Sequence, residues 1–350
     1  MYKNNNVLFI VGPSLGHIAR TITIGRQLAA DGLNIQFVCD DRYDYAKKLI
    51  KPLFPLHELK VDINEDKGVL FADTVLKLVD KIKPDVVCYD LSPFPWLIQL
   101  PFLNIPEVFI SNVFLTRLGK ETTNQDLRFQ RVKNAWNKVR KKRSLPALES
   151  YRELYERKLV LLADPQVITD LYTLPENYHC IGSCTWQPEN RNNDEYTGLD
   201  NILYVSTGST GRKKMPDLLV DSIKDILNCS KVIRTDQSHD EKTVRTFLPG
   251  NIILKHSCFA ITQGGTGSSY QALENGVPVG CWPTSNNHRT LGGLLEKLNL
   301  GILFEEHNWE EKIRLLGKNF TPMLNNARAV SATLGNNRLI EKTTGLIGNL

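Results

Sequence analysis

Short, uninterrupted apolar runs alternate with longer amphipathic stretches in the first part of the chain. Val7 to Val11 is an apolar run of strand length that ends in a Gly-Pro turn, and apolar residues recur with helical spacing from Ile18 to Ala30. Two more strand-like runs, 34–39 and 85–89, are each followed by aspartate. Strands that are buried on both faces and alternate with helices are typical of a parallel, doubly wound sheet.

The same pattern restarts after residue 200. Strand-like runs cover 201–206, 231–234 and 259–262, and a glycine follows the first and the third of them closely. The segment between the two series is polar and rich in asparagine, which is typical of a linker. We therefore predict an α/β chain of two Rossmann-like, doubly wound domains that face one cleft. We predict an N-terminal domain over 1–185, a linker over 186–200 and a C-terminal domain over 201–330. The remaining residues, 331–350, are predicted to form a C-terminal helix that packs back on the first domain.

Composition places the chain among ordinary globular proteins. Its 350 residues are 41% hydrophobic and 23% charged. The longest apolar stretch, Leu97 to Leu115, contains two prolines and a glutamate, so we expect no transmembrane helix and a cytoplasmic location. Seven scattered cysteines favour reduced thiols over disulfides or a zinc site, and we expect no metal.

Positive charge is concentrated in one segment. Residues 117–158 contain thirteen Lys or Arg and five Asp or Glu, and the densest part is the cluster 138–143. This cluster could bind phosphates or an anionic membrane surface, which would place the protein peripherally at a membrane; the alternative is a solvated helix face. No motif for nucleic acid accompanies the charges, so we expect no nucleic-acid partner.

The strongest motif follows the apolar run that ends at Thr262. Gln263, Gly264 and Gly265 form a turn that leads into a predicted helix, an arrangement that favours a diphosphate at the first amides of the helix. A second interpretation is structural, with Ser268 and Ser269 as helix caps.

The segment 261–278 resembles the nucleotide-diphosphate-sugar motif of GT-B glycosyltransferases of the UDP-glycosyltransferase type, including its Gly-Val-Pro sequence. Upstream, 247–256 is similar to the Trp-x-Pro-Gln-x-x-x-Leu-x-His pattern of that family, with Phe247 at the ring that stacks on the nucleobase. In the first half, Gly16-His17 looks like the turn that carries the general base of the family, and Asp90 looks like the aspartate that orients that base. Without the resemblance, Asp90 could equally be a helix cap.

The resemblance implies a metal-independent, inverting transfer of a sugar from a nucleotide diphosphate to an acceptor hydroxyl. His17 would take the acceptor proton, and a carboxylate on the other ring nitrogen would fix the tautomer and stabilise the imidazolium. It implies no cofactor, a UDP- or dTDP-linked donor and a small-molecule or lipid acceptor. The implied donor-binding residues are Thr207, Gly208, Ser209, Phe247, Gln263, Gly264, Gly265, Thr266, Gly267, Ser268, Gln271, Asn287 and His288.

Four positions depart from the family pattern. Gln263 replaces a histidine expected on the diphosphate, Gln271 a glutamate expected on the ribose, and Gly250 a glutamine; Asn287-His288 replaces an Asp-Gln pair expected on the sugar. The alternatives are therefore a nucleotide-sugar epimerase or lipid-linked sugar transferase of the same fold, and a non-catalytic, degenerate partner.

The first testable prediction concerns Phe247. The Phe247→Ala variant is expected to weaken UDP binding by about 1–3 kcal/mol, the range typical of a base stacked on an aromatic ring. Isothermal titration calorimetry measures this loss. Unchanged affinity combined with a lower unfolding temperature would instead identify Phe247 as a core residue.

Overall fold

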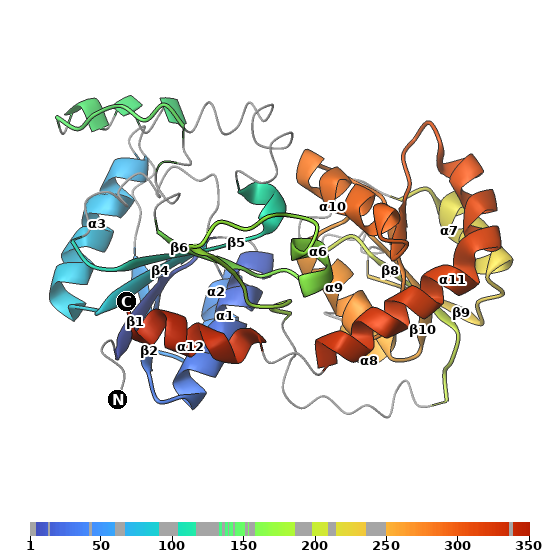
Figure 1. The fold of residues 1–350 in the computed structure, drawn as a ribbon, viewed down its shortest axis with the longest axis horizontal. Helices are drawn as coiled ribbons and strands as arrows, with labels where there is room; N and C mark the ends of the chain where they lie inside the picture. Colours follow the sequence, from blue (N-terminus) through green and yellow to red (C-terminus); the bar gives the residue numbers. More distant parts are fainter. Residues whose placement is uncertain are drawn as a thin grey trace. The chain divides into compact units, whose positions relative to one another are not determined.

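The protein divides into two compact units, 1–184 with 338–350, and 185–337. The computed structural model describes residues 5–12, 15–41, 44–59, 67–90, 104–116, 133–134, 137–138, 140–142, 144–150, 153, 158–185, 198–208, 215–235, 250–335 and 339–350. Each unit is built around its own parallel sheet (Figure 1), which confirms the predicted α/β class.

Unit 1 contains a seven-stranded sheet in the order β3-β2-β1-β4-β5-β6-β7, with every described pair parallel. The strands are β1 (Asn6–Ile10), β2 (Asn34–Asp40), β3 (Leu56–Leu59), β4 (Val86–Asp90), β5 (Glu107–Ser111), β6 (Leu159–Leu162) and β7 (Tyr178–Cys180). The helices are α1 (Leu15–Ala30), α2 (Asp44–Ile50), α3 (Lys67–Ile82), η2 (Val113–Leu115), α6 (Gln166–Thr169), η5 (Leu339–Glu341) and α12 (Lys342–Gly348). The strand order reverses between β1 and β4, so their carboxyl ends open side by side at the switch point where α/β sheets bind ligands.

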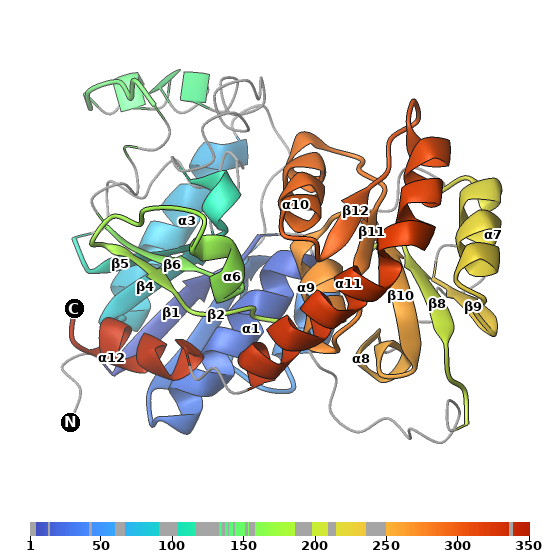
Figure 2. The ribbon, with the colours of Figure 1, turned by 45° about the vertical axis from the view of Figure 1, so that its right-hand side comes forward.

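The central strands of unit 1 are apolar because helices cover both faces of the sheet. All residues of β4 and β5 are buried, including Glu107. Phe9 and Phe37 stack across β1 and β2 with ring centroids 4.9 Å apart. Helix α12 lies beside α1 (Figures 1 and 2), and Thr344 donates a hydrogen bond to the Asp31 carboxylate. The C-terminal segment thus belongs to the first unit, although α11 continues through the expected boundary at 331 as far as Gly335.

Unit 2 contains a five-stranded parallel sheet in its described part, in the order β12-β11-β10-β8-β9. Its elements are β8 (Ile202–Ser206), α7 (Asp217–Ile226), β9 (Lys231–Arg234), α8 (Gly250–Leu254), β10 (Ser257–Thr262), α9 (Thr266–Glu274), β11 (Val279–Cys281), α10 (Asn286–Lys297), β12 (Gly301–Leu303) and α11 (Trp309–Gly335). The order reverses between β8 and β10, and Ser206 pairs with Thr262, so the two predicted donor loops start next to each other.

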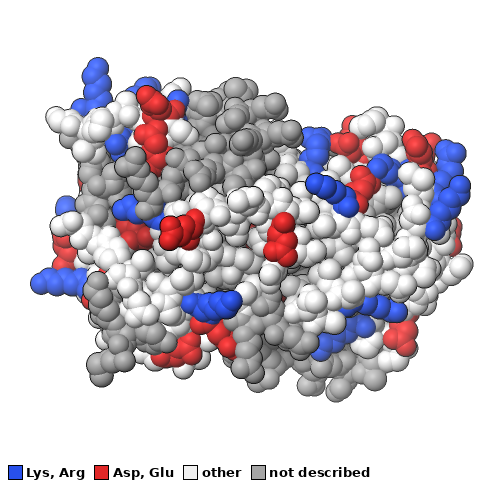
Figure 3. Space-filling view, in the orientation of Figure 1, with Lys and Arg blue, Asp and Glu red and all other residues white. Residues whose placement is uncertain are grey.

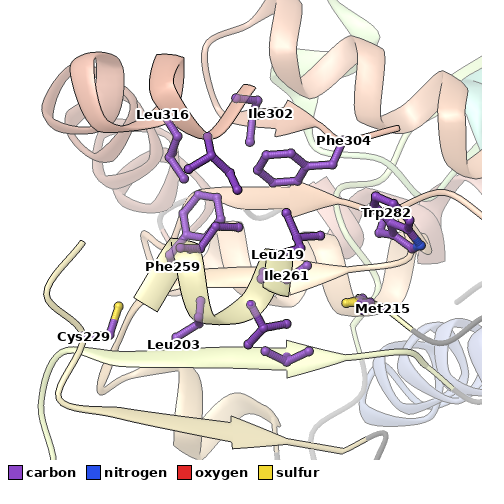
Figure 4. Packing of buried hydrophobic residues seen from close by; sticks show 14 of the residues in the cluster. Leu203, Met215, Leu219, Cys229, Phe259, Ile261, Trp282, Ile302, Phe304 and Leu316 are labelled. Atoms are coloured by element: carbon purple, nitrogen blue, oxygen red, sulfur yellow. The ribbon is translucent and has the colours of Figure 1, made fainter. Parts of the chain in front are cut away.

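The core of unit 2 lies between one face of this sheet and the helices α7 and α11 (Figure 4). Phe259 and Ile261 on β10 point toward Leu219 of α7 and Leu316 of α11, and each of these four side chains is fully buried. A fully buried side chain of this size contributes about 1.5–3 kcal/mol. This packing holds the β8 and β10 ends in place.

No helix in the described ranges is both long and apolar enough to cross a membrane. All seven cysteines are free thiols. In the basic cluster 138–143 the prediction of a solvent-facing surface is wrong for Arg140, which is buried and donates from Nε to the Pro146 carbonyl at 2.7 Å. Lys138, Lys141 and Lys142 are exposed. On the face drawn in Figure 3, basic and acidic side chains are interspersed.

The second testable prediction concerns Glu107, at the start of β5. Its side chain is 1% exposed and pairs with Lys158 at 2.9 Å. Burial raises the pKa of Glu107 from 4.5 to about 7, despite the opposing effect of Lys158. Because the folded state then holds the proton more tightly than the unfolded chain, the free energy of unfolding falls as pH rises from about 4.5 to about 7.

The Glu107→Gln variant has no such proton to lose. Relative to the native protein, its free energy of unfolding is expected to rise by about 2–3 kcal/mol across this pH interval. Urea unfolding at several pH values measures it, with Glu310→Gln as a control that removes an exposed carboxylate. Parallel stability curves for Glu107→Gln and the native protein would contradict the assignment.

Candidate active site

The first group of predicted site residues lies at the switch point of unit 1. His17 is in the first turn of α1, and Asp90 is the last residue of β4. The structure brings them together: His17 Nδ1 lies 2.6 Å from Asp90 Oδ1. The histidine side chain keeps 21% of its surface exposed, whereas the aspartate side chain has none. With a proton on Nδ1, His17 donates to Asp90, and its Nε2 then carries the lone pair that can accept a proton.

Three further polar residues surround this pair, and the sequence analysis did not select them. Arg20, one helical turn after His17, donates from Nε and Nη2 to the two oxygens of Asp90. Its Nη1 donates to Asn112 Oδ1 at 2.5 Å. Asn112 in turn donates to Asp164 Oδ1 at 2.9 Å. The signal that could have found two of them is the one that found Asp90: Asn112 and Asp164 each come just after a buried strand, β5 and β6.

Electrostatics in this group are dominated by burial and by the arginine. Burial alone would raise the pKa of the Asp90 carboxyl, but attraction to Arg20 and His17 and their hydrogen bonds outweigh it, so the pKa is lowered. Burial also disfavours the charged form of Arg20, yet Asp90 and the nearby Asp164 raise its pKa. Asp90 is therefore an ionised carboxylate without solvent contact.

The second group of predicted site residues lies at the switch point of unit 2. Thr207 and Gly208 follow β8, while Gln263, Gly264 and Gly265 follow β10. Ser209 and Phe247 lie outside the described residues. Gly264 has a φ of +81°, and a Cβ there would come within 2.6 Å of the His288 carbonyl oxygen. The glycine thus allows the loop after β10 to contact the start of α10, which carries Asn287 and His288.

Within the described part of the chain, the start of α9 is open on its outer side. A Cβ placed on Gly267 would meet no described atom within 4 Å, and one on Gly265 would meet only Ser268 Oγ, at 3.9 Å. Neither serine caps the helix: Gly265 is the N-cap residue and no side chain accepts there, while Ser269 is buried against Thr262 Oγ1 at 3.0 Å. The capping interpretation is therefore wrong. The first amides of this nine-residue helix and its positive dipole end can receive an anion.

Two buried polar atoms at this place have no hydrogen-bond partner among the residues that the structure describes: Gln263 Nε2 and Asn287 Oδ1. One is a donor and the other an acceptor. A buried polar atom without a partner costs about 1–3 kcal/mol, and a polar ligand would remove that cost. His288 is held by Thr284, with Nδ1 and Oγ1 3.0 Å apart. In the described part of the chain, no group of three or more His, Cys, Asp or Glu side chains could hold a metal ion.

Gln271 lies one helical turn further along α9 than Gly267. Its Oε1 would be only 2.6 Å from a Cβ at residue 250, and the Tyr204 hydroxyl would be 3.2 Å from the same point. The side chain of Gln271 thus covers the glycine at the start of α8. Two of the four departures from the family pattern, Gly250 and Gln271, are therefore in contact.

Comparison with known proteins agrees with this picture. No family model matches the chain. Two relatives, a PGL/p-HBAD biosynthesis glycosyltransferase of Mycobacterium tuberculosis and a PGL/p-HBAD biosynthesis rhamnosyltransferase of Mycobacterium bovis, are each 25% identical to it. The matches cover 86% and 79% of this chain, and 81% and 72% of the relatives.

Solved structures share the whole fold. The glycosyltransferase of kitacinnamycin superposes with a TM-score of 0.75 at 16% identity and covers 99% of both chains. The calicheamicin glycosyltransferase CalG4 superposes with a TM-score of 0.71 at 16% identity, over 99% of this chain and 98% of its own. The fold is therefore GT-B. Together with the relatives, it supports a glycosyltransferase function and favours an enzyme over the non-catalytic alternative.

The third testable prediction separates structural from ligand-binding glycines in the loop after β10. The Gly264→Ala variant is expected to lose about 1–3 kcal/mol of stability, because it combines a left-handed conformation with a clash against the His288 carbonyl. The Gly267→Ala variant should keep its unfolding temperature and lose affinity for UDP, since the methyl group enters the open side of the helix start. Thermal unfolding and calorimetry measure the two effects. A Gly267→Ala variant with native affinity would contradict diphosphate binding at α9.

Proposed function

We propose that the protein is an inverting glycosyltransferase that uses a nucleotide-diphosphate sugar and in which His17 is the general base. The observation that carries the proposal is the 2.6 Å contact between His17 Nδ1 and the buried carboxylate of Asp90, which leaves Nε2 as the proton acceptor. The acceptor hydroxyl would lose its proton to Nε2 as its oxygen attacks the anomeric carbon. The bond to the diphosphate then breaks on the opposite face of the sugar, and configuration inverts.

Unit 2 would bind the donor. The open amides at the start of α9 and the buried Gln263 amide suit the two phosphates, because they offer hydrogen-bond donors without a full charge. Asn287 and His288 would face the sugar, and Thr207 and Gly208 would line the same sheet edge. Such fixed donors stabilise the negative charge that develops on the leaving group. We propose a nucleotide-diphosphate donor on this basis, and the resemblance of the sequence to UDP-glycosyltransferases favours a UDP- or dTDP-linked sugar.

For the acceptor we propose a small molecule or a lipid. The two mycobacterial relatives are named for PGL/p-HBAD biosynthesis, and one of them is a rhamnosyltransferase. The exposed Lys138, Lys141 and Lys142 would support contact with an anionic membrane surface, at about 1 kcal/mol for each charge near the surface. A lipid acceptor could then be reached from the membrane interface.

The fourth testable prediction addresses the base. The His17→Ala variant is expected to lose about 10²–10⁴-fold in kcat, the usual contribution of general base catalysis. Asp90→Asn should lose most of its activity as well, because the amide neither fixes the tautomer nor balances an imidazolium. UDP affinity should stay unchanged in both variants, since both residues belong to unit 1.

Transfer assays with a panel of UDP- and dTDP-linked sugars, together with calorimetry, measure these effects. His57→Ala is the matched control, because His57 lies in the same unit and is paired with Gln36 on another strand. Native turnover in His17→Ala would overturn the mechanism. Inversion itself is read from the anomeric configuration of the product by NMR.

A further inference from the structure

The feature of unit 1 that the proposed mechanism leaves unexplained is the buried guanidinium of Arg20. The residue is 6% exposed, although it lies only one turn from the partly exposed His17. It donates to both oxygens of Asp90 and to Asn112, so three of its nitrogens are held by buried acceptors. Its Nη2 also lies 3.0 Å from His17 Nδ1, and both nitrogens donate to Oδ1 of Asp90.

The network continues away from the histidine and is fastened to the sheet. Asn112 donates to the Ala163 carbonyl at 3.1 Å and to Asp164 Oδ1 at 2.9 Å. The second oxygen of Asp164 accepts from the Val113 amide at 2.7 Å. Asp164 is fully buried. Residues at the ends of three adjacent strands, β4, β5 and β6, are therefore linked. Arg20 on α1 joins Asp90 to Asn112, and Asn112 joins Asp164.

Geometry limits what Asp90 can do. A planar guanidinium that bonds both oxygens of a carboxylate fixes the plane of that carboxylate. Because Asn112 holds the third nitrogen, the arginine cannot rotate without breaking the whole set. Oδ1 of Asp90 is thus kept facing Nδ1 of His17. An aspartate held only by the histidine could rotate about its side-chain bonds.

Charge gives the arginine a second effect. A buried carboxylate without a cation would take up a proton or move toward water, because burial disfavours its ionised form. An arginine stays protonated under all ordinary conditions. The charged and titratable groups that face one another here are Arg20, the carboxylates of Asp90 and Asp164, and the imidazole of His17, with the Cys184 thiol also near Arg20. One arginine against two carboxylates leaves negative charge that an imidazolium can balance.

We propose that Arg20 is a positioning residue for the transfer reaction: it holds Asp90 ionised and in the orientation that fixes the proton of His17 on Nδ1. The inference rests on the proposed role of His17. When the acceptor O–H bond breaks, its proton goes to Nε2 and the Nδ1 proton stays in the bond to Asp90. The imidazolium then completes the charge balance of the buried group, and Arg20 never contacts the substrate.

The experiment compares Arg20→Met and Arg20→Lys with the native enzyme. Arg20→Met keeps the length of the side chain and removes the charge, and kcat is expected to fall about 10²-fold, the loss typical of a misplaced catalytic group. The loss of kcat in Arg20→Met should deepen as pH is lowered. Without the guanidinium, the buried Asp90 carboxylate takes up a proton at a higher pH than it does in the native enzyme. An ammonium can replace the charge but not the two-point contact, so Arg20→Lys should recover about tenfold of the loss. The KM for the donor should not change.

Lys158→Met is the matched control. It also removes the cation from a buried carboxylate, Glu107, but at the opposite end of β5 from Asn112. Both methionine variants are expected to unfold at lower temperature, and only Arg20→Met should lose kcat when both are assayed well below their unfolding temperatures. Equal loss of kcat in the two variants would reduce Arg20 to a structural role and overturn the proposal.

A readout that does not depend on activity keeps the proposal separate from the proposed function. The ¹⁵N chemical shifts of the His17 ring report which nitrogen carries the proton. The native protein should show the Nδ1–H tautomer, and Arg20→Met a mixture of both. An unchanged tautomer in Arg20→Met overturns the positioning role even if His17 is the base. A lost tautomer together with native turnover in His17→Ala would overturn the mechanism and leave the structural action of Arg20 in place.

Discussion

A carboxylate without solvent contact governs the architecture of unit 1. Asp90 ends the β4 strand at the switch point of the sheet, where its charge has no water to stabilise it. Its ionised state therefore depends on hydrogen-bond donors placed by other elements, and α1 supplies two: the imidazole of His17 in its first turn and the guanidinium of Arg20 one turn later. The spacing of three residues puts them on one face of the helix. The hydrogen bonds of Asp90 consequently join the start of α1 to the end of β4, at the place where the candidate active site lies.

The switch point of the sheet in unit 2 carries different types of residue from the switch point in unit 1. The loop after β10 contains two glycines and a glutamine instead of charged side chains. Among the described residues, Gln263 Nε2 and Asn287 Oδ1 are buried and have no hydrogen-bond partner, whereas Asp90 is bonded by both His17 and Arg20. A preformed ionic site and an incomplete neutral one suit different tasks. The first can hold a proton in a fixed place, and the second can bind a polar molecule that arrives and leaves.

Much of the fold was predictable because several parallel strands in this protein are short, apolar and directly followed by a glycine turn or a polar residue. The runs that end before Gly12, at Asp90 and before Gln263 were found in this way. The resemblance to the family then selected His17 and Asp90 at two of these strand ends. The strands β5 and β6 were not found, since they are short and their neighbours are basic or rich in proline. Asn112 and Asp164 were therefore missed.

Arg20 was missed for a different reason. Arginine in a helix is usually a solvent-exposed residue, and burial of a guanidinium cannot be read from spacing alone. It follows only when the carboxylate that faces it is known, which requires the register between β1 and β4. Arg140 shows the same limit in the basic cluster, where a run of like charges predicted a surface and one of its members instead bonds a backbone carbonyl. A run of like charges thus does not show which of its side chains reach solvent and which are buried.

The departures in the donor motif become easier to interpret once they are seen in space. Gly250 and Gln271 are distant in the sequence, but a side chain at 250 would occupy the place that the Gln271 amide already fills. A larger residue at 250 would require the Gln271 side chain to turn away, so the glycine at 250 permits the orientation that Gln271 adopts here. Where the family pattern has a glutamate, Gln271 is uncharged, so this position also lacks a negative charge. The proposed donor site would therefore differ from the family pattern in both shape and charge at this point, while the amides of the helix start, which need no particular side chain, are left as they are.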